Sequence, residues 1–200
     1  IELKKGKKIY FASDNHLGLN AELSSKEREK FFVEWLDKVS KDVIRFIMLT
    51  RRNDQTIEFD YSKVKEQSKD NPVFYVNYAY ARCKSIMNSS KQLDLNIDLE
   101  KISSLINKDE INLIKLVSQW PRVLESSAKY LEPHRVCFYL IDLASEFHSL
   151  WNKGNEDKNL KFILKDNLNI SIARIALVKS VALTLETGLN VLSIKPLSKM

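Results

Sequence analysis

Two tyrosines and an arginine share one face of a predicted helix. Tyr75, Tyr78 and Arg82 are spaced i, i+3 and i+7, so on a helix their side chains stand above one another. Aromatic rings in such a column can stack on unpaired bases, and a guanidinium can neutralise a phosphate. Core packing with an arginine that reaches to solvent gives the same pattern, and spacing alone favours that interpretation.

A second aromatic pair lies near the end of another predicted helix. Phe147 and Trp151 are spaced i, i+4, which places both rings on one helix face. A tryptophan one turn before a helix end is often partly exposed, although core packing is the more common role. The pair is therefore a second candidate for contact with a planar ligand.

Helices must position these side chains, because helical patterns follow one another from residue 40 onward. Apolar residues with a period near 3.6 predict helices over residues 42–49, 72–87, 98–106, from 109 past 120, 133–154 and 170–187. Asn71-Pro72 and Glu132-Pro133 mark helix starts, Pro121 predicts a kink or a break, and Gly154 and Gly188 mark helix ends. The sequence predicts an all-α helical bundle over residues 40–200.

The first 39 residues have a different pattern. Residues 9–13 form a short β-branched and aromatic run typical of a strand, and a capping signal at Ser24 begins a helical pattern. We therefore expect a small strand–helix appendage over residues 1–39 and a helical domain over residues 40–200.

Composition excludes several classes of protein. The 200 residues are 44% hydrophobic and 29% charged, which excludes wholesale disorder. The net charge of +6 permits a nucleic-acid partner without requiring one. Cys83 and Cys137 have no metal-site spacing and indicate a reducing, cytoplasmic setting. We expect no membrane span, no signal peptide and no membrane partner.

Several segments carry a family resemblance in addition to these patterns. The stretch DNPVFYVNYAYAR over residues 70–82 resembles a stretch of arginyl-tRNA synthetases. Further resemblances lie at residues 42–54, at EPHR with the following helix over 132–149, and at 188–192 with a terminal Met200. In this order, residues 40–200 resemble the α-helical DALR-type anticodon-binding domain of that family.

The resemblance implies a partner and a set of site residues. The partner is tRNA(Arg), bound by the C-terminal part of a cytoplasmic, monomeric arginine–tRNA ligase. The positions that would surround the splayed anticodon bases are Tyr75, Tyr78, Arg82, Phe147, Trp151 and Met200. Tyr80 and Asn77 depart from the family's usual histidine and glutamine, and Phe147 stands where relatives carry a hydroxylated aromatic ring. We place Arg51 and Arg52 near the tRNA backbone.

Catalytic motifs of the family are missing from the sequence. Class I synthetases hold ATP with a HIGH-type motif and a KMSK-type loop, and neither occurs in these residues. We therefore assign no catalytic residue and no cofactor to this chain, whereas the resemblance implies ATP and Mg in the whole enzyme. Whether a catalytic domain acts in trans stays open, as does enzymatic activity of the chain.

The N-terminal segment has a resemblance of its own. Residues 7–18 are similar to the first strand and D-x-H motif of calcineurin-like metallophosphoesterases, of the UDP-2,3-diacylglucosamine hydrolase type. In that family Asp14 and His16 would be ligands of a two-metal centre, which requires roughly six to eight ligands in total. A metal-dependent phosphoesterase fragment and a non-catalytic helical interaction module are the alternatives, and the chain is a fragment, a fusion or a graft.

Overall fold

Helices alone make up the regular structure of the described residues. The computed structural model describes residues 41–52, 71–90, 99–164 and 166–200. Its helices are α2 (Lys41–Leu49), α4 (Pro72–Ser89), α5 (Leu99–Ile102), α6 (Lys108–Tyr130), α7 (His134–Glu156), the 3₁₀ turn η1 (Lys158–Leu160) and α8 (Leu168–Val191). This confirms the predicted all-α bundle. The predicted strand–helix appendage, including Asp14 and His16, lies outside the described residues.

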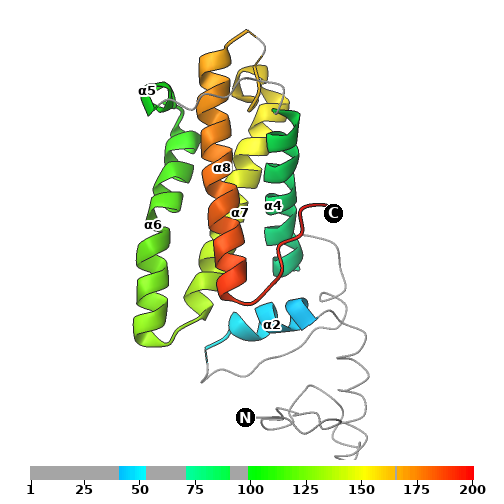
Figure 1. Ribbon diagram of the computed structural model, residues 1–200, viewed down its shortest axis with the longest axis vertical. Coiled ribbons are helices and arrows are strands. Elements are labelled where there is room, and N and C mark those ends of the chain that lie inside the picture. The colour runs from blue at the N-terminus through cyan, green and yellow to red at the C-terminus, as the bar shows by residue number, and fades with distance from the viewer. Residues whose placement is uncertain (1–40, 53–70, 91–98, 165) are drawn as a thin grey trace, which may run out of the picture.

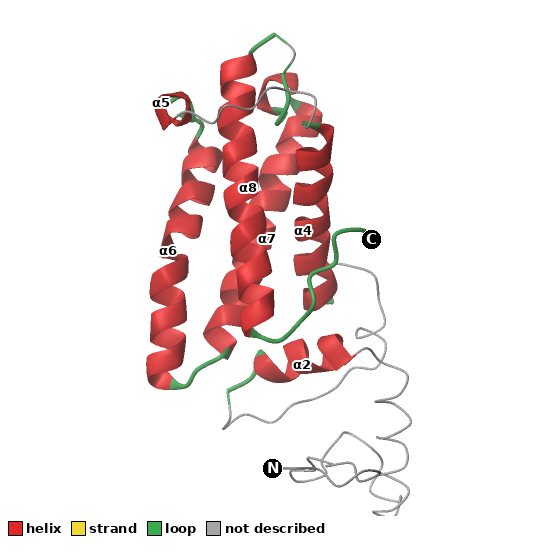
Figure 2. Cartoon of the chain, in the orientation of Figure 1, coloured by secondary structure: helices red, strands yellow, loops and turns green. Residues whose placement is uncertain are grey.

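The long helices α4, α6, α7 and α8 stand side by side, and α2 lies across one end of them (Figures 1 and 2). Helix α8 supplies much of the core, with Ile175, Val178, Val181 and Leu185 fully buried. By length and composition α8 could cross a membrane, but 61% of its most apolar window is buried inside the bundle. Its apolar character is therefore that of a core helix that packs most of its surface against the other helices.

Asn71 starts α4 as the sequence predicts. Its side-chain oxygen accepts the backbone N–H of Phe74 at 3.3 Å, and Pro72 occupies the first turn, where its missing N–H costs nothing. The helix then continues to Ser89. This cap fixes where the first turn of α4, which carries Tyr75, begins.

Two predicted helix ends and one predicted break are wrong. Gly188 lies inside α8, which continues to Val191. A Cβ there would meet the Leu140 side chain at 2.5 Å, so the glycine allows close packing of α7 and α8. Gly154 lies inside α7, where a Cβ would stand 3.0 Å from the Leu160 carbonyl oxygen. Helix α6 runs unbroken past Pro121, an exposed position where water can take the place of the lost backbone hydrogen bond.

The C-terminal tail, residues 193–200, returns along α2 and α4 (Figure 1). The Leu197 backbone N–H donates to the Asn77 side-chain oxygen at 2.9 Å. Arg45 of α2 donates to the Ser193 carbonyl oxygen at 2.5 Å, and the Lys195 N–H donates to Asp42 at 3.3 Å. These three bonds fix the tail against α2 and the first half of α4.

Candidate nucleic-acid interface

The predicted tyrosines and arginine of α4 meet two side chains of α7. The Arg82 guanidinium carbon lies 4.2 Å from the centroid of the Tyr78 ring and 4.9 Å from that of the Trp151 ring. One Arg82 nitrogen also donates to the Tyr78 hydroxyl at 2.6 Å. The structure therefore confirms that these residues are neighbours, and places Trp151 with them. We call Tyr75, Tyr78, Arg82, His148 and Trp151 the α4–α7 column.

Arg82 carries the charge of the column without an acidic partner. Within the part of the chain that the structure describes, its one hydrogen bond goes to Tyr78 and no carboxylate pairs with it. A guanidinium has five N–H donors, so donors remain for a phosphate oxygen or a base edge. Tyr75, Tyr78, Arg82 and Trp151 are all half-buried, which combines a fixed geometry with access from solvent.

His148 packs the two tyrosines from behind. Its ring lies 4.6 Å from the Tyr75 ring and 5.4 Å from the Tyr78 ring, measured between centroids, and its Nε2 is 3.4 Å from the Tyr75 carbonyl oxygen. Burial lowers the pKa of His148 below its usual value, and the charge of Arg82 lowers this pKa further, against a raising effect of the bond to Tyr75. His148 is therefore neutral at pH 7 and adds a flat, uncharged support.

Phe147 does not belong to this surface. Its side chain is 0% exposed and its ring packs on the buried Phe162 ring, with 5.8 Å between centroids. The prediction that Phe147 faces anticodon bases is therefore wrong. Phe147 shares a face of α7 with Trp151, and the rings of both pack on Phe162. Phe147 lies at the buried end of this contact and Trp151 at its half-buried edge.

Met200 lies at the end of the tail, next to the segment that bonds α4. Leu197 is bonded to Asn77, whose chain neighbour is Tyr78, and Met200 follows three residues later with 53% of its surface exposed. The tail thus ends beside α4, and its apolar side chain is accessible. A role for Met200 in base contact stays a prediction.

Arg51 and Arg52 are exposed and lie apart from the column. Arg52 sits 3.7 Å from a carboxylate oxygen of Glu132, at the corner between α6 and α7. Arg135 is the main cause, with Arg52 a smaller one, of a lowered pKa at Glu132. The Arg52 charge is thus shared with an acidic neighbour, and its place on a tRNA backbone stays a prediction.

Sequence reasoning missed His148 and Asn77 as site residues. His148 precedes Trp151 by three positions, so a helical wheel already puts the two on one face, but an adjacent phenylalanine offered the rival pairing. Asn77 was noted only as a shorter replacement for glutamine. No local pattern could show that its amide meets Leu197, because 120 positions separate the two residues.

The sequence and the fold match a known domain family. Residues 76–200 match the DALR anticodon binding domain. Since this match covers more than half of the chain, the chain belongs to the DALR anticodon-binding domain family.

The relatives of the chain are arginine–tRNA ligases. The enzyme of Ehrlichia chaffeensis is 44% identical over 201 residues, which is 100% of this chain and 34% of that protein. That of Rickettsia africae is 45% identical over 169 residues, 82% of this chain and 29% of that protein. The solved arginyl-tRNA synthetase of Thermus thermophilus is 26% identical, with a TM-score of 0.66 over 80% of this chain and 26% of its own.

The chain spans about a third of the length of these curated relatives. The match to the Ehrlichia protein extends through the first 39 residues as well, so the comparisons do not favour the phosphoesterase alternative. Among the described residues, no group of three or more His, Cys, Asp and Glu side chains could hold a metal ion.

Proposed function

We propose that this chain binds the anticodon loop of arginine tRNA through the α4–α7 column, as the anticodon-binding part of a cytoplasmic arginyl-tRNA synthetase. The carrying observation is the contact of the Arg82 guanidinium with the rings of both Tyr78 and Trp151, at 4.2 Å and 4.9 Å from their centroids. Unpaired bases stack on such planar groups, and a guanidinium without a carboxylate partner attracts the RNA backbone. Membership of the DALR family supports this proposal.

Aminoacylation belongs to the whole enzyme in this proposal. ATP and Mg²⁺ would serve a catalytic part that these residues do not resemble, and this chain would supply recognition of the tRNA. A catalytic part that joins the chain covalently and one that acts in trans are both compatible with a column built entirely from α4 and α7.

The test compares an arginine tRNA transcript with the same transcript carrying a substituted anticodon, each at low and high salt. We expect discrimination that persists at high salt, because stacking is less sensitive to salt than phosphate contacts. Tyr78→Ala and Trp151→Ala should each cost about 1–3 kcal/mol of binding free energy. Tyr130→Ala is the matched control, because Tyr130 is 58% exposed at the far end of α6.

Equal affinity of both transcripts, abolished by salt and indifferent to all three variants, would contradict the proposal. The chain would then be a helical interaction module whose aromatic column only stabilises the packing of α4 against α7. Loss of discrimination in Tyr130→Ala as well would show that the site lies elsewhere on the bundle.

A further inference from the structure

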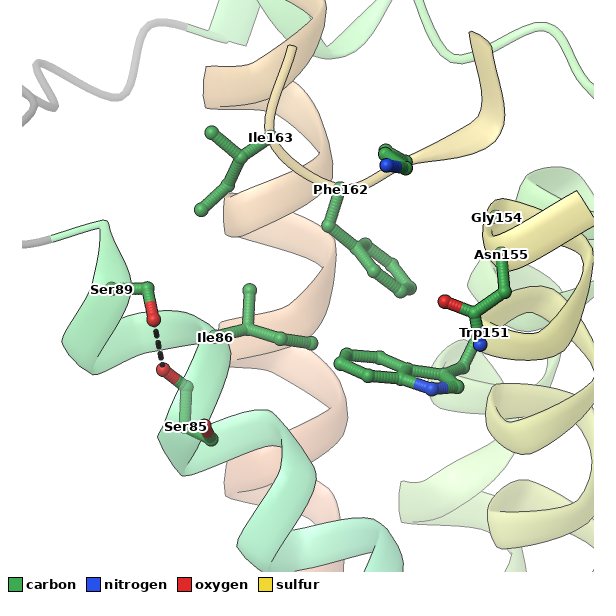
Figure 3. Close-up of a pocket in the computed structure, with 9 residues that line it drawn as sticks. Ser85, Ile86, Ser89, Trp151, Gly154, Asn155, Phe162 and Ile163 are labelled. Carbon is green, nitrogen blue, oxygen red and sulfur yellow. Dashed lines mark hydrogen bonds between the residues drawn. The ribbon is translucent and has the colours of Figure 1, made fainter. Parts of the chain in front are cut away.

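A pocket of about 240 Å³ lies directly beyond the column, between the C-terminal halves of α4 and α7 (Figure 3). Its apolar lining consists of Ile86, Trp151, Phe162 and Ile163. Ser85 and Ser89 line the α4 side, where the Ser89 hydroxyl donates to the Ser85 carbonyl oxygen at 3.1 Å (Figure 3). Of the residues that line the pocket, the sequence analysis proposes only Trp151 as a binding residue.

Trp151 is shared by the column and the pocket. Arg82 lies over its ring with 4.9 Å to the centroid, and the Phe162 ring lies 6.1 Å away at an interplanar angle of 29°. Figure 3 shows the Trp151 and Phe162 rings one above the other, with Ile86 facing them from α4. Since Ser85 follows Arg82 by one helical turn, a strand held by the column passes the pocket next.

The lining suits a single planar, polar-edged ring. Aromatic and aliphatic walls contact the faces of a ring, while hydroxyls contact its edge atoms. The volume is below the roughly 300–1,000 Å³ of pockets for drug-sized ligands, so it suits one base rather than a larger ligand. The exposed Lys161 also lines the pocket and adds a positive charge for a phosphate group.

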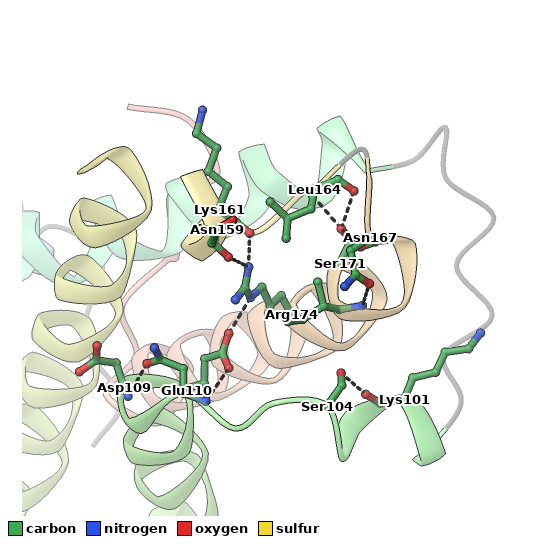
Figure 4. A network of polar contacts seen from close by, with 12 residues as sticks. Lys101, Ser104, Asp109, Glu110, Asn159, Lys161, Leu164, Asn167, Ser171 and Arg174 are labelled. Atoms are coloured by element: carbon green, nitrogen blue, oxygen red, sulfur yellow. Dashed lines mark hydrogen bonds and ion pairs between the residues drawn. The ribbon is translucent and has the colours of Figure 1, made fainter. Parts of the chain in front are cut away.

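A buried polar network fixes the pocket wall from behind (Figure 4). Arg174, 3% exposed, donates to the carbonyl oxygens of Asn159 and Lys161 at 2.7 Å each. Its Nε donates to Glu110 at 2.6 Å. The segment that presents Phe162 is thereby held by a buried arginine, and a rigid wall reduces the cost of ordering a ligand on it.

We propose that this pocket binds one unstacked nucleobase of the RNA strand that lies on the column, adjacent to the bases stacked there. This inference rests on the proposed function and extends it by one subsite. Ser85→Phe fills the pocket from an exposed helix position, and Ser89→Phe fills it from one turn further along α4. Ser118→Phe, at an exposed position of α6, is the matched control.

The experiment uses the 200-residue chain and an RNA hairpin with the anticodon stem and loop of an arginine tRNA. Versions of the hairpin lack the base at one loop position at a time. We expect both filling variants to weaken binding of the intact hairpin about tenfold, as the loss of one base contact does. Ser118→Phe should bind like the wild type, and thermal melting monitors the folding of every variant.

Coupling between a variant and a loop position identifies the subsite. At one loop position, a hairpin without the base should bind the wild-type protein more weakly than the intact hairpin does. The same two hairpins should bind Ser85→Phe with equal affinity. Full affinity of both filling variants, together with weak binding by Tyr78→Ala, would overturn the subsite and leave the proposed function intact. Full affinity of Tyr78→Ala as well would overturn both.

Discussion

Two arginines of this bundle have opposite surroundings. Arg174 is 3% exposed and its guanidinium bonds a carboxylate of Glu110 and the carbonyl oxygens of Asn159 and Lys161. Arg82 is half-buried, touches two aromatic rings and has no acidic partner among the described residues. The first guanidinium has fixed protein partners on both sides, whereas the second keeps donors available. The comparison separates an arginine that holds the fold from one suited to a ligand.

The largest expected effect comes from opening the Arg174 network. Glu110→Ala leaves a buried, unpaired cation and also removes the carboxylate that accepts the Asn107 N–H at the start of α6. We expect the free energy of unfolding to fall by about 3–5 kcal/mol, measured by denaturant titration.

The neighbouring Asp109 provides the control for this prediction. Asp109 pairs with the exposed Lys153 at 2.7 Å, so Asp109→Ala should cost only about 0–1 kcal/mol. Similar losses in Glu110→Ala and Asp109→Ala would contradict the distinction between a buried and a surface pair.

Arg82→Gln should weaken RNA binding strongly and change stability little, whereas Glu110→Ala mainly lowers stability. We expect about tenfold weaker binding of arginine tRNA, because a charged hydrogen bond contributes roughly 1.5–3 kcal/mol. The salt dependence of binding should fall by about one phosphate contact if the guanidinium meets the backbone. Loss of stability should stay near 1 kcal/mol or below, the size of a cation–π contact. Arg122→Gln, at an exposed position of α6, is the control.

Unchanged affinity of Arg82→Gln together with a large loss of stability would reverse the assignment. Arg82 would then be a packing residue like Arg174. The aromatic residues of the column would be core residues, as their spacing alone favours.

Asn77 tests whether its side-chain hydrogen bonds hold the C-terminal tail on α4. Its Nδ2 donates to the Val73 carbonyl oxygen at 3.1 Å and its Oδ1 accepts from Leu197. Asn77→Ala should cost roughly 0.5–1.5 kcal/mol of stability. Amide hydrogen exchange at Leu197 should become faster, while exchange in the middle of α8 should not. Slow exchange at Leu197 in this variant would show that other contacts hold the tail.

The smallest effect is expected from pH, through His148. Its folded-state pKa is lowered by burial, so below about pH 6.5 the unfolded chain takes up the proton more readily than the folded one. Stability should therefore be full above that pH and fall on acidification. Thermal melts between weakly acidic and neutral pH should show this slope, and it should flatten in His148→Gln. A slope that survives in His148→Gln would assign the effect to another group.

The sequence predicts the bundle and every residue of the column except His148 from local patterns and the family resemblance. Helical periods and the Asn71-Pro72 cap locate α4, and the spacing of Tyr75, Tyr78 and Arg82 places them on one face. The role of Gly188 could not be predicted, because the side chain that leaves no room for a Cβ there is that of Leu140, on another helix. The inward turn of Phe147 likewise depends on how α7 rotates against α4. Both features depend on how two helices pack against each other, and the residue pattern of one helix does not show this.

The tail gives the site a place in the order of folding. Its bonds to Asn77, Arg45 and Asp42 join residues 120, 148 and 153 positions apart. Closing such long loops is entropically costly, so contacts of this kind form after local helices and slow the overall reaction. In chain order, residues 193–197 follow α4, α7 and α8, so they are synthesised after all three helices. The α4–α7 column can therefore form before the tail docks on α2 and α4.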